Sequence, residues 1–166
     1  MKQTEVTEKI IGGNNFYIKP FPAFVAANIS GDLAALITPM IGGLAPLLAE
    51  KKVDNIMDAD AEDVLPAISS AFSGLSGDKF ERLMKKLLID HKNISVEAEA
   101  TGGNVKIMDY DTANEVFCGD VQDMFILCFE VIRINFGGFF KKLGAQFGSL
   151  QEVVQKVTPR STSTEN

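Results

Sequence analysis

Apolar and polar residues alternate near the start of the chain, in the stretch "KIIGGNNFYIKPF". Ile10 and Ile11 form an apolar pair, a cluster of glycine and asparagine follows at residues 12–15, and alternation returns with Phe16 and Ile18. An apolar run and an alternating stretch on the two sides of a Gly/Asn cluster are typical of two antiparallel strands joined by a tight turn. The pattern predicts a β-hairpin over about residues 6–19.

The pattern becomes helical after this hairpin. Pro22 suits the first position of a helix through "AFVAANI", because the amide that proline lacks has no helical partner there. The sequence Ser30-Gly31-Asp32 either interrupts that helix or caps the next one, and helical pieces are expected as far as about Lys52. Residues 33–49 are uncharged, but prolines and a glycine pair favour a buried, broken helix pair over a membrane span.

Two further helices are predicted in the middle of the chain. Apolar residues recur at helical spacing over residues 64–72, after an acidic loop, until Gly74 and Gly77 end the pattern. The clearest helix is "DKFERLMKKLLID", in which Asp78 and Glu81 have the spacing of a capping box. One stripe of this helix is apolar, and it consists of Phe80, Leu83, Met84, Leu87 and Leu88.

The period returns to two in residues 94–110. Val96, Ala98 and Ala100 alternate with Glu97 and Glu99, and "TGGN" follows as a turn. We expect a second hairpin here. Because an isolated two-stranded hairpin is marginal in water, it is expected to pair with the first one in a small sheet.

The most apolar long run is "DVQDMFILCFEVIRINF", near the carboxyl end. One helical stripe of it comprises Val121, Met124, Phe125, Cys128, Phe129, Ile132 and Phe136. Apolar residues also fill much of the other side, namely Ile126, Leu127, Val131 and Ile134. A helix that is apolar nearly all round is expected to be central to the fold or shared between subunits.

These elements predict a fold that is mainly α with one or two small β-hairpins, in the α+β class. A chain of 166 residues, of which 46% are hydrophobic, suits a single compact helical domain over residues 1–157. Its helical body would span about residues 22–147. The tail at residues 158–166 has too little apolar content to fold and is expected to be disordered.

The charge and the reactive residues restrict the function. A net charge of -6 disfavours nucleic-acid binding. Cys118 and Cys128 lack metal-ligand spacing and are expected to be buried free thiols in a reducing compartment, while His91 suits a surface or helix-capping position. The glycine pairs match no phosphate-binding motif, and the acidic loop lacks the glycine and glutamate of a calcium loop. No catalytic site, metal or cofactor is predicted.

An aromatic cluster, "NFGGFFKKLG", follows the apolar run. Its glycine pair allows the preceding helix to end or bend, since glycine lowers helix stability by about 1 kcal/mol. The phenylalanines are either a helix corner in the core or a hinged patch that grips another chain. On the second interpretation the partner-binding residues are Phe136, Gly137, Gly138, Phe139, Phe140, Lys141 and Phe147.

Two motifs also resemble a known family. "GGNNFYIKPFPAFVAANISGDLA" and "EVIRINFGGFFKKLG" resemble the tail assembly chaperones of long-tailed (siphovirus-type) bacteriophages, with motifs at residues 21–28 and 135–140. The resemblance spans roughly residues 10–147. It implies a non-enzymatic protein, without a cofactor, that coats the helical tape measure protein and keeps it soluble before the tail tube polymerises.

The same resemblance implies further partners and a location. A longer, frameshifted form of such chaperones recruits the tail tube protein, and this chain would be the short form. Self-association is expected, in the host cytoplasm and outside the mature virion. The alternatives are a structural tail component retained in the virion, such as a terminator or tube-associated subunit, and a small membrane-active protein built on residues 33–49.

Overall fold

The structure is a computed structural model that describes residues 5–37, 66 and 76–157. For residues 36, 37 and 140–157 it describes the backbone alone. The described elements are strands and helices in the order β1, β2, α1, α4, β3, η3, β4, α5 and α6, and they form an α+β fold. The predictions for the broken helix pair beyond residue 37, the acidic loop, the helix at 64–72 and the tail at 158–166 lie outside these residues.

The predicted first hairpin is confirmed. Strand β1 (Thr7–Ile11) pairs antiparallel with β2 (Asn14–Ile18) across a two-residue turn. Both turn residues, Gly12 and Gly13, have positive φ angles of 55° and 78°. Such a turn matches the twist of the two strands, and glycine adopts it without a steric penalty.

The second hairpin is shorter than predicted. Strand β3 (Ile94–Glu97) is followed by the short 3-10 helix η3 (Glu99–Thr101) before β4 (Lys106–Ile107) returns antiparallel to it. Strand β3 also pairs antiparallel with β2, so the two hairpins form one four-stranded sheet in the order β1-β2-β3-β4. The expected union of the hairpins is thus confirmed, although Ala100 lies in the 3-10 turn rather than in a strand.

Helix α1 (Ala23–Ile37) corrects one prediction. It runs without interruption through Ser30, Gly31 and Asp32, which therefore neither break nor cap a helix. Ile29 and Leu33 are buried on the two sides of this triplet, with exposures of 0% and 2%. Burial of these two side chains offsets the low helix propensity of glycine, which costs about 1 kcal/mol.

Helix α4 (Gly77–Leu88) has the predicted apolar stripe but not the predicted cap. Leu83, Met84, Leu87 and Leu88 are buried, and Phe80 packs against the core. The N-cap residue is Ser76, which makes no side-chain capping bond, so the capping-box prediction from Asp78 and Glu81 is wrong.

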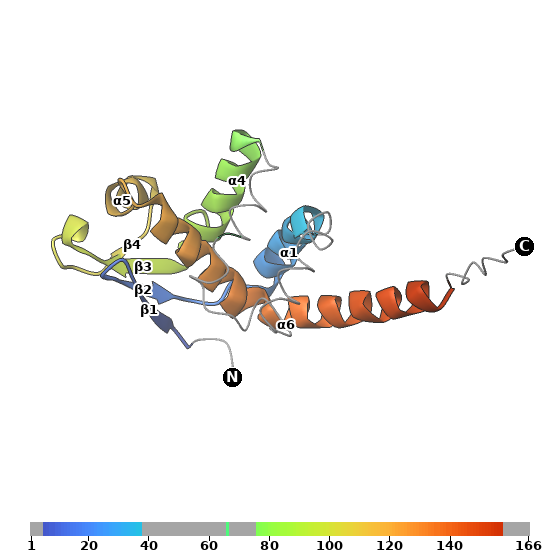
Figure 1. Cartoon of the computed structure of the whole chain (residues 1–166). Coiled ribbons are helices and arrows are strands. Elements are labelled where there is room, and N and C mark those ends of the chain that lie inside the picture. Colours follow the sequence, from blue (N-terminus) through green and yellow to red (C-terminus); the bar gives the residue numbers. More distant parts are fainter. Residues whose placement is uncertain (1–4, 38–65, 67–75, 158–166) are drawn as a thin grey trace, which may run out of the picture.

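Helix α5 (Tyr110–Val116) is short and capped at its start by Asp109, whose carboxylate accepts a hydrogen bond from the Thr112 amide at 2.8 Å. It leads to Phe117, whose ring stacks on Phe16 of the sheet with centroids 5.8 Å apart. In Figure 1, helices α4, α5 and the first part of α6 lie on one side of the sheet.

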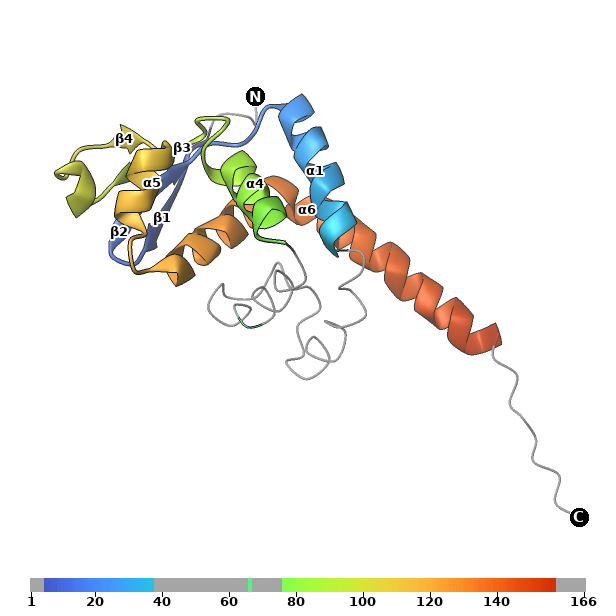
Figure 2. The same cartoon turned by 90° about the horizontal axis from the view of Figure 1, so that it is seen from above.

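Helix α6 (Val121–Val157) is the longest element and does not end at the glycine pair. It changes direction partway along its length in both views, and its last part extends away from the other elements (Figures 1 and 2). We call residues 121–137 its proximal half and residues 138–157 its distal half. The proximal half and the remaining described elements form the body of the protein.

The proximal half is central to the fold, as predicted for a helix that is apolar nearly all round. Leu127 and Val131 are fully buried, and Cys128 and Phe129 are almost so, whereas Val121 at the start of the stripe is 51% exposed. A buried carboxylate ties this helix to the sheet edge. Glu130 accepts from Arg133 at 2.6 Å and pairs with Lys9 of β1 at 3.2 Å.

Candidate partner-binding site

The two motifs of residues 21–28 and 135–140 meet in space. The Phe21 amide donates a hydrogen bond to Asn135 Oδ1 at 2.7 Å, across 114 positions of sequence. The Phe21 ring lies 6.1 Å from the ring of Phe136 and packs edge-on against His91 at 5.7 Å. We call Phe21, Asn135 and Phe136 the motif junction.

The sequence explains why this junction forms. Prolines at 20 and 22 flank Phe21 and have no amide hydrogen, so the Phe21 amide is the single backbone donor of the three residues. Phe21 is only 7% exposed, and a buried amide needs an acceptor. The Asn135 side chain supplies that acceptor, while its own Nδ2 donates to the Val131 carbonyl at 2.8 Å, one helical turn back.

The residues predicted to bind a partner divide into three groups. Phe136 is 3% exposed and lies in the core, as the helix-corner interpretation expects, and its part in partner binding stays a prediction. Gly138 and Phe139 are exposed, Phe139 by 37%, and Gly137 is half-buried. Phe140, Lys141 and Phe147 lie on the distal half of α6, in the part where the structure describes the backbone alone. Partner binding by this stretch stays a prediction.

Phe24 is an exposed aromatic residue that the sequence interpretation missed. Its side chain is 93% exposed, three positions after the buried Phe21 and within the same motif. The signal was present, because Val25, Ala26 and Ile29 follow the helical spacing of a buried face and leave residue 24 outside it. The exposed side of α1 beyond it carries small residues, Ala27, Gly31 and Ala35.

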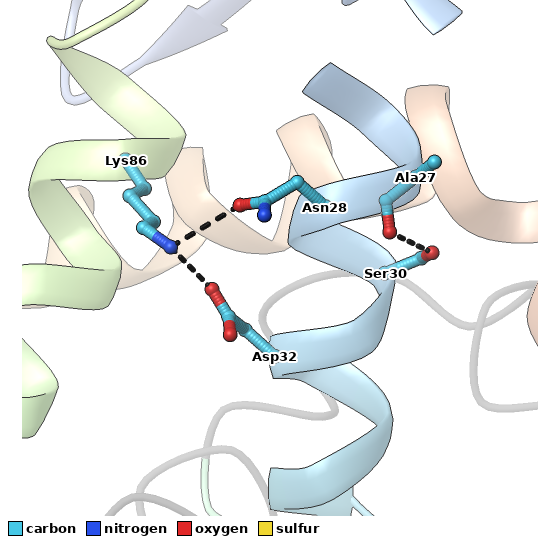
Figure 3. A network of polar contacts seen from close by, with 5 residues as sticks. All are labelled: Ala27, Asn28, Ser30, Asp32 and Lys86. Carbon is cyan, nitrogen blue, oxygen red and sulfur yellow. Dashed lines mark hydrogen bonds and ion pairs between the residues drawn. The ribbon is translucent and has the colours of Figure 1, made fainter. Parts of the chain in front are cut away.

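A polar network joins α1 to α4 beside this surface (Figure 3). Lys86 of α4 reaches across to Asp32 at 2.6 Å and to Asn28 Oδ1 at 3.3 Å, and Ser30 bonds the Ala27 carbonyl of its own helix at 2.8 Å. Asn28 is the last residue of the first motif. Its side chain therefore helps to fix the orientation of α1 on the body.

The two cysteines lie in different surroundings. Cys128 is buried, its Sγ lies 3.1 Å from Met84 Sδ, and desolvation raises the pKa of its thiol far above the usual range. Cys118 is a free thiol but exposed, so the prediction that both thiols are buried is wrong for Cys118. Within the described ranges, no three His, Cys, Asp or Glu side chains gather to hold a metal ion.

No helix in the described part of the chain is both long and apolar enough to cross a bilayer. Together these observations define a class. The protein is a small α+β protein whose described surface offers exposed aromatic residues near two joined motifs. Exposed aromatic residues that lie together are typical of surfaces that contact other proteins.

A comparison with known protein families identifies the family to which the chain belongs. The family described as "Phage tail assembly chaperone protein, TAC" matches residues 12–148, which include both motifs and the whole motif junction. The chain therefore belongs to the phage tail assembly chaperones. Searches among curated proteins and among solved structures found no match.

Proposed function

We propose that this chaperone binds the tape measure protein and keeps it soluble until the tail tube polymerises around it. The observation that carries the proposal is Phe24. A phenylalanine that is 93% exposed forgoes most of the roughly 1.5 to 3 kcal/mol that burial would contribute, and Phe24 lies in the same motif as the buried Phe21. A residue of this kind is expected to be exposed in the isolated chain when another polypeptide covers it in the working state.

The proposed contact surface consists of Phe24 and Phe139, on the two helices that leave the motif junction. No charged residue occurs at residues 21–31 or 134–140, so an apolar helix could approach without desolvating a charge. The small residues Ala27 and Gly31 on the exposed side of α1 allow close approach of such a helix. Contacts of this kind bind without catalysis and need no cofactor.

The remaining expectations from the family belong to the same proposal. The chain self-associates when it has no client, which covers its apolar surface. It acts in the host cytoplasm and leaves before the virion is complete. A longer, frameshifted form of the protein recruits the major tail tube protein to the coated tape measure.

Co-expression tests the proposal. With the native chain, the tape measure protein should move from the insoluble to the soluble fraction. Replacing both Phe24 and Phe139 with serine should remove at least half of that effect. Ile107→Ser is the matched control, because Ile107 is 55% exposed on the far strand β4, and it should retain full activity.

Two outcomes contradict the proposal. One is a tape measure protein that is no more soluble with the native chain than alone. The other is a control variant that loses as much activity as the double phenylalanine variant, since the effect would then not belong to the proposed surface. Circular dichroism of each variant confirms that the helices are retained.

A further inference from the structure

Asn135 uses both polar groups of its side chain, and they connect two different parts of the molecule. Oδ1 accepts from the Phe21 amide at 2.7 Å, which fixes α6 to the segment between the sheet and α1. Nδ2 donates to the Val131 carbonyl at 2.8 Å, within α6 itself. This carbonyl is the normal acceptor for the backbone amide four residues later, so the side chain competes with the helical ladder at that turn.

A glycine pair follows almost directly. An added Cβ at Gly137 or Gly138 would meet no atom within 4 Å, so these glycines are not required by close packing. Glycine pairs and inserted polar groups are the usual sites at which helices bend. Helix α6 does change direction partway along its length (Figures 1 and 2).

Among the contacts that the structure describes, two attach α6 to the body just before the glycine pair: the Phe21–Asn135 hydrogen bond and the Phe21–Phe136 ring contact. Phe136 is 3% exposed and contacts the Phe21 ring, whereas Gly138 and Phe139 are exposed. The turn at Asn135 directly precedes the glycine pair, and the distal half follows it. The Phe21 amide, which prolines flank, is the group from the body that holds this side chain.

We propose that Asn135 is a positioning residue, a latch that sets the direction of the distal half of α6 relative to the body. With the Phe21 hydrogen bond made, α6 leaves the body in one direction. With the bond broken, the glycine pair allows many directions. A partner that displaces Phe21 or Phe136 from the junction therefore releases the distal half. Because such coupling is reciprocal, a partner that holds the distal half in another direction weakens the contacts of the junction.

Double electron–electron resonance measures this direction in the full chain. Cys118 is exposed on the body and accepts one spin label, Ser149→Cys provides the second on the distal half, and the buried Cys128 stays unlabelled. Dilution with unlabelled protein removes distances between different molecules. We expect a narrow distance distribution for the parent protein and at least a twofold broader one for Asn135→Leu.

Three further variants make the test specific. Asn135→Asp keeps the acceptor for Phe21 and should keep the parent width, whereas Asn135→Gln displaces the acceptor by one methylene and should broaden the distribution. The glutamine variant also replaces the leucine variant should that one not fold. Asn104→Leu, at an exposed turn, is the control and should change nothing.

Several outcomes overturn the proposal. One is a distance distribution of unchanged width in both the leucine and the glutamine variants. The others are a distribution that broadens in the aspartate variant, or in the Asn104→Leu control, as much as it does in Asn135→Leu. A purely structural role of Asn135 would lower the melting temperature of the variants and leave the distances unchanged. The measurement needs no client, so it stands apart from the test of tape measure binding.

Discussion

Both halves of helix α6 are rich in apolar residues, but their surroundings differ. In the proximal half, the sheet and α4 cover the apolar side chains, and Leu127 and Val131 are fully buried. The distal half is also rich in apolar residues, including Phe140, Leu143, Phe147 and Leu150, yet it extends away from the labelled elements in both views. An apolar sequence alone therefore does not decide which half lies against the sheet.

The difference between the halves shows which contacts bury the proximal half. The proximal half starts against the hairpin turn and is held by the Lys9–Glu130–Arg133 network and by the motif junction. Each of these anchors is made by residues distant in sequence. The glycine pair follows the last of these described anchors, and Phe139 of the proposed contact surface comes directly after it.

Matched leucine substitutions give the largest expected contrast between the halves. Leu127→Ala should lower the free energy of unfolding by about 2 to 5 kcal/mol, because it leaves a cavity in the core. Leu150→Ala in the distal half should lower it by less than about 1 kcal/mol in dilute protein. Urea unfolding measures both, and equal losses would mean that the distal half is packed like the proximal one.

Glycine substitutions sharpen the comparison at the start of α6. Gly12 has φ 55°, and an added Cβ would collide with the Asp123 carboxylate in the first turn of the helix. Gly12→Ala should cost about 1 to 3 kcal/mol, from left-handed strain and the displaced carboxylate. Gly13→Ala adds the strain without a collision, so it should cost less.

Gly138→Ala provides the counterpart in the distal half, where the residue is helical and open to solvent. Its effect should have the opposite sign, a gain of up to about 1 kcal/mol. Thermal unfolding of the three glycine variants measures these stability changes and checks their expected order. A loss of stability in Gly138→Ala would show that this glycine is packed rather than free.

The smallest effect is expected where α1 meets α4. Asp32→Asn removes the ion pair between Asp32 and Lys86. The Asp32 side chain is 47% exposed and the Lys86 side chain 31%. Exposed pairs contribute less than about 1 kcal/mol, and salt screens them. Unfolding in low and high salt should show a small difference that high salt removes. A large, salt-independent loss would mean that the network in Figure 3 is part of the core.

Local sequence patterns predicted those strands and helices whose formation depends mainly on residues close together in the chain. Alternation and the Gly12–Gly13 turn identified the first hairpin, and the stripe from Leu83 to Leu88 identified the buried face of α4. Strand β3 joined the first hairpin as expected, because a lone hairpin would have left Val96 and Ile94 without cover.

The contacts between distant segments could not be predicted from the chain. Nothing in the sequence shows that the Phe21 amide meets Asn135, and this contact places Phe136 in the core. The same limit explains why α1 continues through Gly31, since burial of Ile29 and Leu33 outweighs the low helix propensity of glycine. Phe24 was overlooked because a phenylalanine in an apolar segment is more often buried than exposed.

Hydrogen–deuterium exchange of the full chain, with and without the tape measure protein, tests the central claim most directly. The account predicts new protection of backbone amides in α1 around Phe24 and in the distal half of α6 from Phe139 onward, with little change in the β1–β2 hairpin. Protection confined to the sheet, or no change at all in the presence of soluble tape measure protein, would contradict it.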